Sequence, residues 1–97
     1  MEYYFDFNSE KNKKLLKIRG ICFEHIVSLI NEGCVLDVII HPNQEKYPGQ
    51  NMYVIDVDGY CYLVPYIQND KEIFLKTIIP SRKATKQYLK NRGTSNE

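Results

Sequence analysis

Residues 52–66 read Met-Tyr-Val-Ile-Asp-Val-Asp-Gly-Tyr-Cys-Tyr-Leu-Val-Pro-Tyr, and this stretch decides the fold. Its two halves, 52–57 and 60–66, are rich in β-branched and aromatic residues, which favour strands. Asp58-Gly59 separates them, and an Asp-Gly pair between such runs is the strongest short-range signal for a β-hairpin. We therefore predict a two-stranded antiparallel unit at the centre of the chain.

Further strands are predicted on either side of this hairpin. Val35–His41 is a β-branched run, and the polar stretch Pro42–Gln50 that follows it predicts an ordered loop. Beyond the hairpin, Asn69-Asp70 predicts a second turn and Ile73–Ile79 predicts another strand. Together these segments predict an antiparallel meander of about four strands.

The aromatic run Tyr3–Phe7 predicts a short first strand that leads directly into a helix. Asn8 is a favourable N-cap residue, the helix is predicted over Ser9–Arg19, and Gly20 is its left-handed stop. Three apolar residues of this helix are expected to face the core: Leu15, Leu16 and Ile18.

Two more helices are predicted, one before the meander and one after it. Four apolar residues at the spacing of one helical face predict the earlier helix: Phe23, Ile26, Val27 and Ile30. It ends at Gly33, and Cys22 stands at its N-cap position, where it caps weakly. Pro80 breaks the last strand, and Ser81 predicts the cap of a final helix from about Arg82 to Asn91.

This order of elements predicts an α+β fold: a short N-terminal strand, two helices, the meander and a C-terminal helix. Runs of helices followed by runs of strands are typical of helices packed on one face of a sheet. Ninety-seven residues suffice for one hydrophobic core but not for two. We therefore expect a single domain over residues 1–97, in which 93–97 form a frayed tail.

Composition excludes several classes of protein. The longest apolar runs fall far short of the about 20 residues that a membrane-spanning helix needs. The first residues lack the basic and apolar parts of a signal peptide. Three cysteines cannot all pair within the chain, and no two lie at Cys-x-x-Cys spacing, which favours reduced thiols and argues against a zinc site. We expect a cytoplasmic protein with no cofactor, no metal and no membrane contact.

The charge is unevenly distributed, although the formal net charge is only +1. Residues 8–20 contain five basic residues and one acidic residue, and residues 81–93 contain five basic residues and no acidic one. The segment between them, 21–80, is net acidic. If the fold brings the two basic segments together, they form one positive face that can bind phosphate groups. The alternative is two solvated helix faces rich in lysine.

Motifs at both ends resemble those of a known family. Phe-Asp-Phe-Asn at residues 5–8, Lys11, and Arg-Gly-Ile-Cys-Phe-Glu at 19–24 resemble the opening of BrnT-type toxins. The pattern of that family is Phe-Glu-Trp-Asp, a Lys three residues later, and His-Gly-Ile-Ser-Phe-Glu. Ile-Pro-Ser-Arg-Lys-Ala-Thr-Lys at 79–86 likewise resembles the family's Ile-Ser-Ala-Arg-Lys-Ala-Thr. The resemblance covers nearly the whole chain in order.

The resemblance implies a RelE-like fold and a metal-independent ribonuclease that cleaves RNA and inhibits translation. It further implies the toxin of a bacterial type II toxin–antitoxin module, which a cognate antitoxin neutralises. The partners implied are that antitoxin and RNA, either free mRNA or mRNA on the ribosome. Operator DNA would be contacted only through the antitoxin.

Metal-independent RNA cleavage needs a base for the 2′-hydroxyl, an acid for the leaving 5′-oxygen, and cations for the phosphorane. Arg82 is the first candidate cation because a guanidinium group holds phosphate with two hydrogen bonds. Lys76 is expected beside Arg82 at the scissile phosphate. His41, at the end of its strand, is the candidate base, and Tyr66 is the candidate proton donor.

The RNA strand is expected in a basic groove between the first helix, the sheet and the last helix. Five residues are expected to bind it there: Lys17, Arg19, Lys83, Lys86 and Tyr88. For each of these residues a structural interpretation stays open, because lysines on a terminal helix are usually solvated and tyrosines more often pack than bind.

Two other functions remain as alternatives. The first is a non-catalytic module of the same fold that binds RNA or an antitoxin without cutting. It arises because Leu15, Ile18 and Thr77 stand where the BrnT-type pattern has Asn, Lys and Arg. The second is a protein-interaction domain that uses the acidic middle of the chain.

Overall fold

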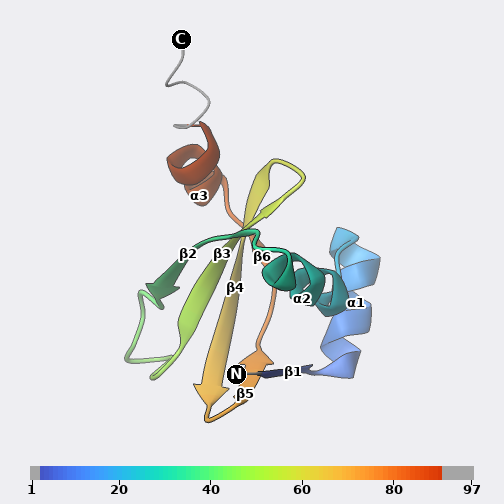
Figure 1. Ribbon diagram of the computed structural model, residues 1–97, viewed down its shortest axis with the longest axis vertical. Helices are drawn as coiled ribbons and strands as arrows, with labels where there is room; N and C mark the ends of the chain where they lie inside the picture. Colours follow the sequence, from blue (N-terminus) through green and yellow to red (C-terminus); the bar gives the residue numbers. More distant parts are fainter. Residues whose placement is uncertain (1–2, 91–97) are drawn as a thin grey trace.

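The computed structural model describes residues 3–90, which form a mixed, mostly antiparallel sheet with helices on both faces (Figure 1). The order of helices and strands is the predicted one, and the α+β class is confirmed. In chain order the elements are β1 (Tyr4–Phe7), α1 (Ser9–Arg19), α2 (Phe23–Asn31), β2 (Val35–Ile40), β3 (Asn51–Val57), β4 (Tyr60–Asn69), β5 (Glu72–Leu75), β6 (Ile79–Pro80), α3 (Arg82–Ala84) and its π-helical continuation η1 (Thr85–Lys90).

The sheet is built on the predicted meander. Its strand order is β1-β5-β4-β3-β2, and β2 to β5 are antiparallel neighbours, whereas β1 pairs with β5 in parallel. The central hairpin forms as predicted: Asp58 and Gly59 have φ angles of 54° and 88°. Both positive values match the turn that joins two twisted antiparallel strands most favourably.

The strand predicted over 73–79 is interrupted. β5 ends at Leu75, residues 76–78 are irregular, and β6 resumes at Ile79. Both parts pair with β4, but their registers differ by one residue, since Leu75 lies opposite Tyr66 and Ile79 lies opposite Leu63. One extra residue is therefore accommodated between them, as in a β-bulge. The prediction of a continuous strand is wrong because this bulge turns Ile78 into the same core as Leu75.

Helices cover both faces of the sheet, so the prediction of one covered face is wrong. On one face α1 and α2 enclose the main core, whose fully buried side chains include Phe23, Ile26 and Ile55. On the other face α3 and η1 pack through Ala84 against Val54 and Cys61. The physical reason lies in β3 and β4, which carry buried apolar residues on both faces and therefore need cover on both sides.

The first helix packs on the sheet through fewer residues than predicted. Leu15 is buried, but 53 % of Leu16 and 69 % of Ile18 is exposed. Figure 1 shows α1 at the margin of the sheet, outside α2. Because of this position, α1 packs on the rest of the protein through one buried apolar residue, Leu15. The expectation that Leu16 and Ile18 face the core is therefore wrong.

Helix ends follow the predicted caps, with one addition. Asn8 caps α1, Gly20 ends it at φ 70°, and the Ser81 hydroxyl accepts the Ala84 N–H at 3.0 Å. Cys22 makes no side-chain cap, as expected, and Asn12 of α1 accepts the Phe23 N–H at 2.7 Å in its place. Asn91 and the tail at 93–97 lie outside the described residues.

Candidate nucleic-acid interface

Arg82 and Lys86 line one open hollow on the surface. They lie four residues apart, on the same side of the C-terminal helix, and both are exposed. Tyr60, at the start of β4, lines the hollow with them, together with Thr85 and Leu89. The hollow has a volume of about 510 Å³. Exposed Tyr60 and two cations therefore border the same space.

Thr85 fixes this helix to the sheet and so determines where Arg82 lies. The Thr85 hydroxyl donates to the Ser81 carbonyl at 2.7 Å and accepts the Cys61 N–H at 2.8 Å. The Ser81 N–H donates to the Cys61 carbonyl at 3.0 Å, which extends the pairing of β6 with β4. Both backbone groups of buried Cys61 are thereby satisfied at the point where Arg82 begins the helix.

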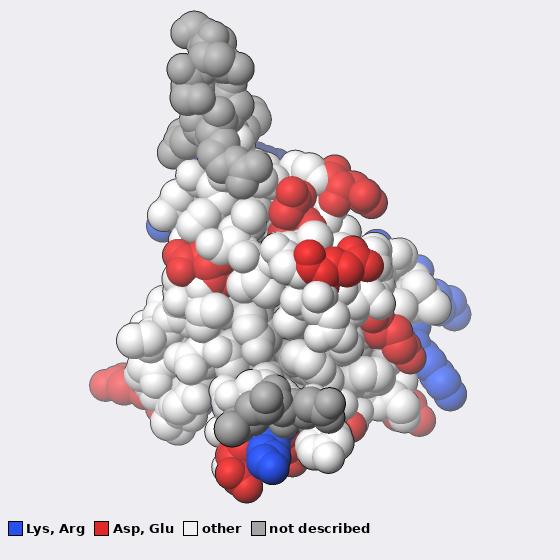
Figure 2. Space-filling model, viewed as in Figure 1, with Lys and Arg blue, Asp and Glu red and all other residues white. Residues whose placement is uncertain are grey.

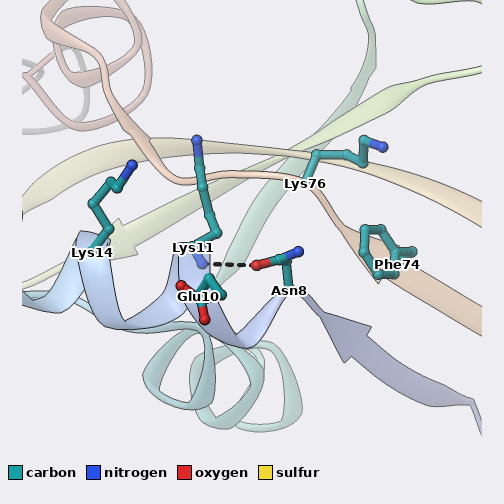
Figure 3. Close-up of a pocket in the computed structure, with 6 residues that line it drawn as sticks. All are labelled: Asn8, Glu10, Lys11, Lys14, Phe74 and Lys76. Atoms are coloured by element: carbon teal, nitrogen blue, oxygen red, sulfur yellow. Dashed lines mark hydrogen bonds between the residues drawn. The ribbon is translucent and has the colours of Figure 1, made fainter.

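Lys76 lies in a different hollow. Lys11 and Lys14 of α1 line it with Lys76, Phe74, Asn8 and Glu10, and its volume is about 550 Å³. Figure 3 shows Lys11 and Lys14 extending from one side of α1, while Lys76 belongs to the irregular segment after β5 and extends away from these two lysines. The Lys76 ammonium group lies 5.3 Å from the centre of the Phe74 ring, in cation–π geometry. Arg82 and Lys76 therefore line two separate hollows.

Arg19 contacts the segment that joins these two hollows. Its guanidinium group donates to the carbonyl of Ile78 at 3.4 Å, and Ile78 lies two residues after Lys76 and four before Arg82 in the chain. We call the six cations that follow this margin of the sheet the basic edge: Lys11, Lys14, Lys76, Arg19, Arg82 and Lys86. On the face shown in Figure 2, Lys and Arg side chains gather mainly at the rim over α1, whereas acidic side chains are scattered.

His41 lies at the other end of the sheet. It follows the edge strand β2, three strands away from β5. That separation is about 14 Å at the usual spacing between strands. The His41 ring packs against Tyr47 with 4.5 Å between ring centres, and its Nδ1 accepts the Asn43 N–H at 3.1 Å. It helps order the loop over 42–50, in which Gln44 bonds the carbonyls of His41 and Gln50.

The two candidate tyrosines are engaged in packing. Tyr66 is buried and stacks on Tyr53, with 4.2 Å between ring centres, in the core under α1 and α2. Burial, together with the neighbouring Tyr66 hydroxyl, raises the pKa of Tyr53 to about 12. Tyr88 is half-buried and donates to the Asp37 carboxylate at 2.6 Å. That hydrogen bond raises the pKa of Tyr88 because it favours the protonated phenol.

The remaining candidates are dispersed. Lys83 lines a third hollow with Ile39, Ile40 and Tyr88, next to β2. Lys17 is exposed on α1 and lines neither hollow of the basic edge. The predicted single groove between the first and last helices is therefore replaced by the basic edge, because those helices lie on opposite faces of the sheet.

Tyr60, Lys11 and Lys14 line these hollows but were not among the predicted site residues. The helical spacing of Lys11 and Lys14 was visible in the sequence, and Lys11 is part of the BrnT-like motif. Nothing local marked Tyr60, because its proximity to Arg82 depends on how α3 folds back over β4.

No protein-family model, curated protein or solved structure that was compared with the chain matches it. The BrnT-type and RelE-like resemblances therefore stay predictions. Within residues 3–90, no helix is both long and apolar enough to cross a membrane. The same residues contain no group of three or more His, Cys, Asp or Glu side chains placed to hold a metal ion.

Proposed function

We propose that this protein binds single-stranded RNA along the basic edge and cleaves it in the Arg82 hollow, as the ribonuclease toxin of a toxin–antitoxin module. A cognate antitoxin that covers the basic edge would neutralise it, and operator DNA would be reached through that antitoxin. The observation that carries the proposal is the grouping of Arg82 and Lys86 with Tyr60 in one accessible hollow. The BrnT-like motifs support the class of reaction, since Arg82 belongs to the closing motif.

In the proposed reaction the 2′-oxygen of the RNA attacks the adjacent phosphorus. A P–O bond forms to give a 2′,3′-cyclic phosphate, and the bond to the 5′-oxygen of the next nucleotide breaks. Arg82 and Lys86 stabilise the negative charge of the phosphorane. The Tyr60 hydroxyl donates its proton to the leaving 5′-oxygen, and water accepts the proton of the 2′-hydroxyl.

The test is brief induction in bacteria without an antitoxin gene, followed by measurement of growth and of transcript length. We expect wild type to arrest growth and shorten transcripts, and Arg82→Ala to do neither. Lys71→Ala is the matched control because Lys71 is an exposed cation in the β4–β5 turn. Intact transcripts in cells that accumulate folded wild-type protein would contradict the ribonuclease function.

One observation favours the non-catalytic alternative. His41 and Tyr66, the proton-transfer residues expected from the sequence, are both occupied outside the Arg82 hollow. In that case the purified protein binds RNA with strong salt dependence and releases no products. Comparing cleavage by wild type and Tyr60→Phe distinguishes the two functions, because only the ribonuclease depends on the Tyr60 hydroxyl.

A further inference from the structure

We propose that Lys11, Lys14 and Lys76 form a second phosphate-binding subsite, which holds the RNA backbone several nucleotides away from the cleaved bond. The inference rests on the proposed function and adds a minimum length to the substrate. Two elements build this subsite: α1 supplies Lys11 and Lys14, and the bulge after β5 supplies Lys76. Lys11 and Lys14 are three residues apart, so they share one face of the helix.

The charge of this hollow points to an anionic ligand. Among the described residues, three lysines and one acidic residue, Glu10, line it. In the part of the chain that the structure describes, none of the three lysines forms an ion pair. Like charges gathered around one space repel one another, and a bound anion relieves that repulsion. A nucleic-acid backbone laid across the hollow would meet Lys11 and Lys14 on one side and Lys76 on the other.

The neutral groups of the hollow fit the same ligand. The Asn8 Oδ1 atom accepts the Lys11 N–H at 2.9 Å, which leaves the amide nitrogen of Asn8 as a donor. Figure 3 shows that nitrogen on the side toward Lys76, between the two sources of positive charge. Lys76 is held over the Phe74 ring. The hollow therefore offers a neutral hydrogen-bond donor, a cation held in place over Phe74, and two further lysines on α1.

The chain itself limits the distance between this subsite and the Arg82 hollow. Lys76 and Arg82 are six residues apart, and six extended residues span at most about 20 Å. A nucleic-acid strand rises about 3.4 Å per nucleotide when stacked, so no more than about six nucleotides are needed to reach from one hollow to the other. Arg19 lies along this path, bound to the Ile78 carbonyl. The geometry thus predicts that short oligonucleotides fill one subsite and longer ones fill both.

The experiment measures binding of labelled oligodeoxyuridylates of 2, 4, 6 and 10 nucleotides by fluorescence anisotropy at several salt concentrations. These oligomers have no 2′-hydroxyl, so they bind without being cleaved. Affinity of wild type should rise steeply up to about six nucleotides and then level off. Lys14→Ala and Lys76→Ala should each weaken binding of the 10-mer by about 3- to 10-fold, lower its salt dependence, and leave the 2-mer unchanged.

Two further variants make the test specific to this hollow. Glu10→Gln removes the one acidic side chain that lines it among residues 3–90, and it should strengthen binding of the 10-mer by about 2- to 3-fold. Lys13→Ala removes an exposed lysine of the same helix that does not line the hollow, and it should have no effect. Thermal unfolding of every variant checks that the fold is retained.

The possible outcomes separate this inference from the proposed function. Equal losses for Lys13→Ala and Lys14→Ala, or equal losses at all oligomer lengths, would overturn the second subsite while leaving cleavage at Arg82 intact. Length-dependent binding that requires Lys14 and Lys76, from a protein that never cleaves RNA, would support the subsite and refute the ribonuclease. A wild-type protein that binds no oligomer at low salt would overturn both.

Discussion

Individual hydrogen bonds hold the candidate interface in place, and Thr85 makes the most consequential of them. Its hydroxyl accepts the N–H of Cys61, whose side chain is fully buried. Thr85→Val keeps the shape of the side chain but leaves that N–H without this partner. We expect the free energy of unfolding to fall by about 1–3 kcal/mol, measured by urea denaturation. Thr85→Ser, which retains the hydroxyl, is the control, and an equal loss in both variants would contradict the assigned role.

Asn12 links the two N-terminal helices. It accepts the Phe23 N–H and donates to the Glu24 carboxylate at 2.8 Å, and this second bond lowers the pKa of Glu24. Asn12→Ala should lower stability at neutral pH by about 1 kcal/mol through loss of the α2 cap. A carboxylate whose pKa is lowered on folding adds stability above its unfolded pKa and loses that contribution as pH falls.

The difference in stability between wild type and Asn12→Ala should therefore shrink as the pH is lowered from neutral through the usual glutamate range. Denaturant titrations at several pH values measure this. A difference independent of pH would show that the Asn12–Glu24 bond contributes nothing.

The raised pKa of Tyr53 predicts that the fold loses stability at alkaline pH. Its pKa is raised to about 12, so the protonated phenol stabilises the folded state below its unfolded pKa of about 10. That contribution is lost as the pH rises from about 10 to about 12, and it amounts to about 3 kcal/mol at most. Tyr53→Phe should flatten the pH dependence of unfolding over this window. Tyr4→Phe, at an exposed position, should leave the dependence unchanged.

At the scale of elements, side-chain hydrogen bonds join the C-terminal helix to the sheet near its start and in its last turn. Thr85 joins its start to β4, and the Tyr88–Asp37 hydrogen bond joins its last turn to β2. Tyr88→Phe removes only the second link. We expect faster amide hydrogen exchange in η1, a loss of about 0.5–1.5 kcal/mol in stability, and no change in exchange of α1. An unchanged exchange rate in η1 would show that the Tyr88–Asp37 hydrogen bond does not help to hold the helix.

Across the whole molecule, the two hollows of the basic edge should act independently. They lie on different elements, and the cations that line one do not line the other. Effects of distant sites on binding usually add. The fold-losses of Lys14→Ala and Arg82→Ala for a 10-nucleotide oligomer should therefore multiply in the double variant. A double variant no weaker than either single variant would show that both cations contact the same phosphate.

The sequence by itself determined the features that depend on neighbouring residues. The Asp58-Gly59 turn, the caps at Asn8 and Ser81, and the stop at Gly20 were all predicted, because capping and turn geometry are satisfied within a few residues. The segments that became helix and strand followed from their periodicity for the same reason. The order of elements, and with it the α+β class, was therefore readable from the sequence.

Only the tertiary structure decided which residues meet. Whether α3 covers the same face as α1 depends on the bulge at 76–78 and on the pairing of β6 with β4, and both are contacts between distant segments. That choice separated Arg82 from Lys76, placed Tyr60 beside Arg82, and left Leu16 and Ile18 exposed. Local propensity carries no information about such contacts, because their free energy comes from burying two faces of one sheet at once.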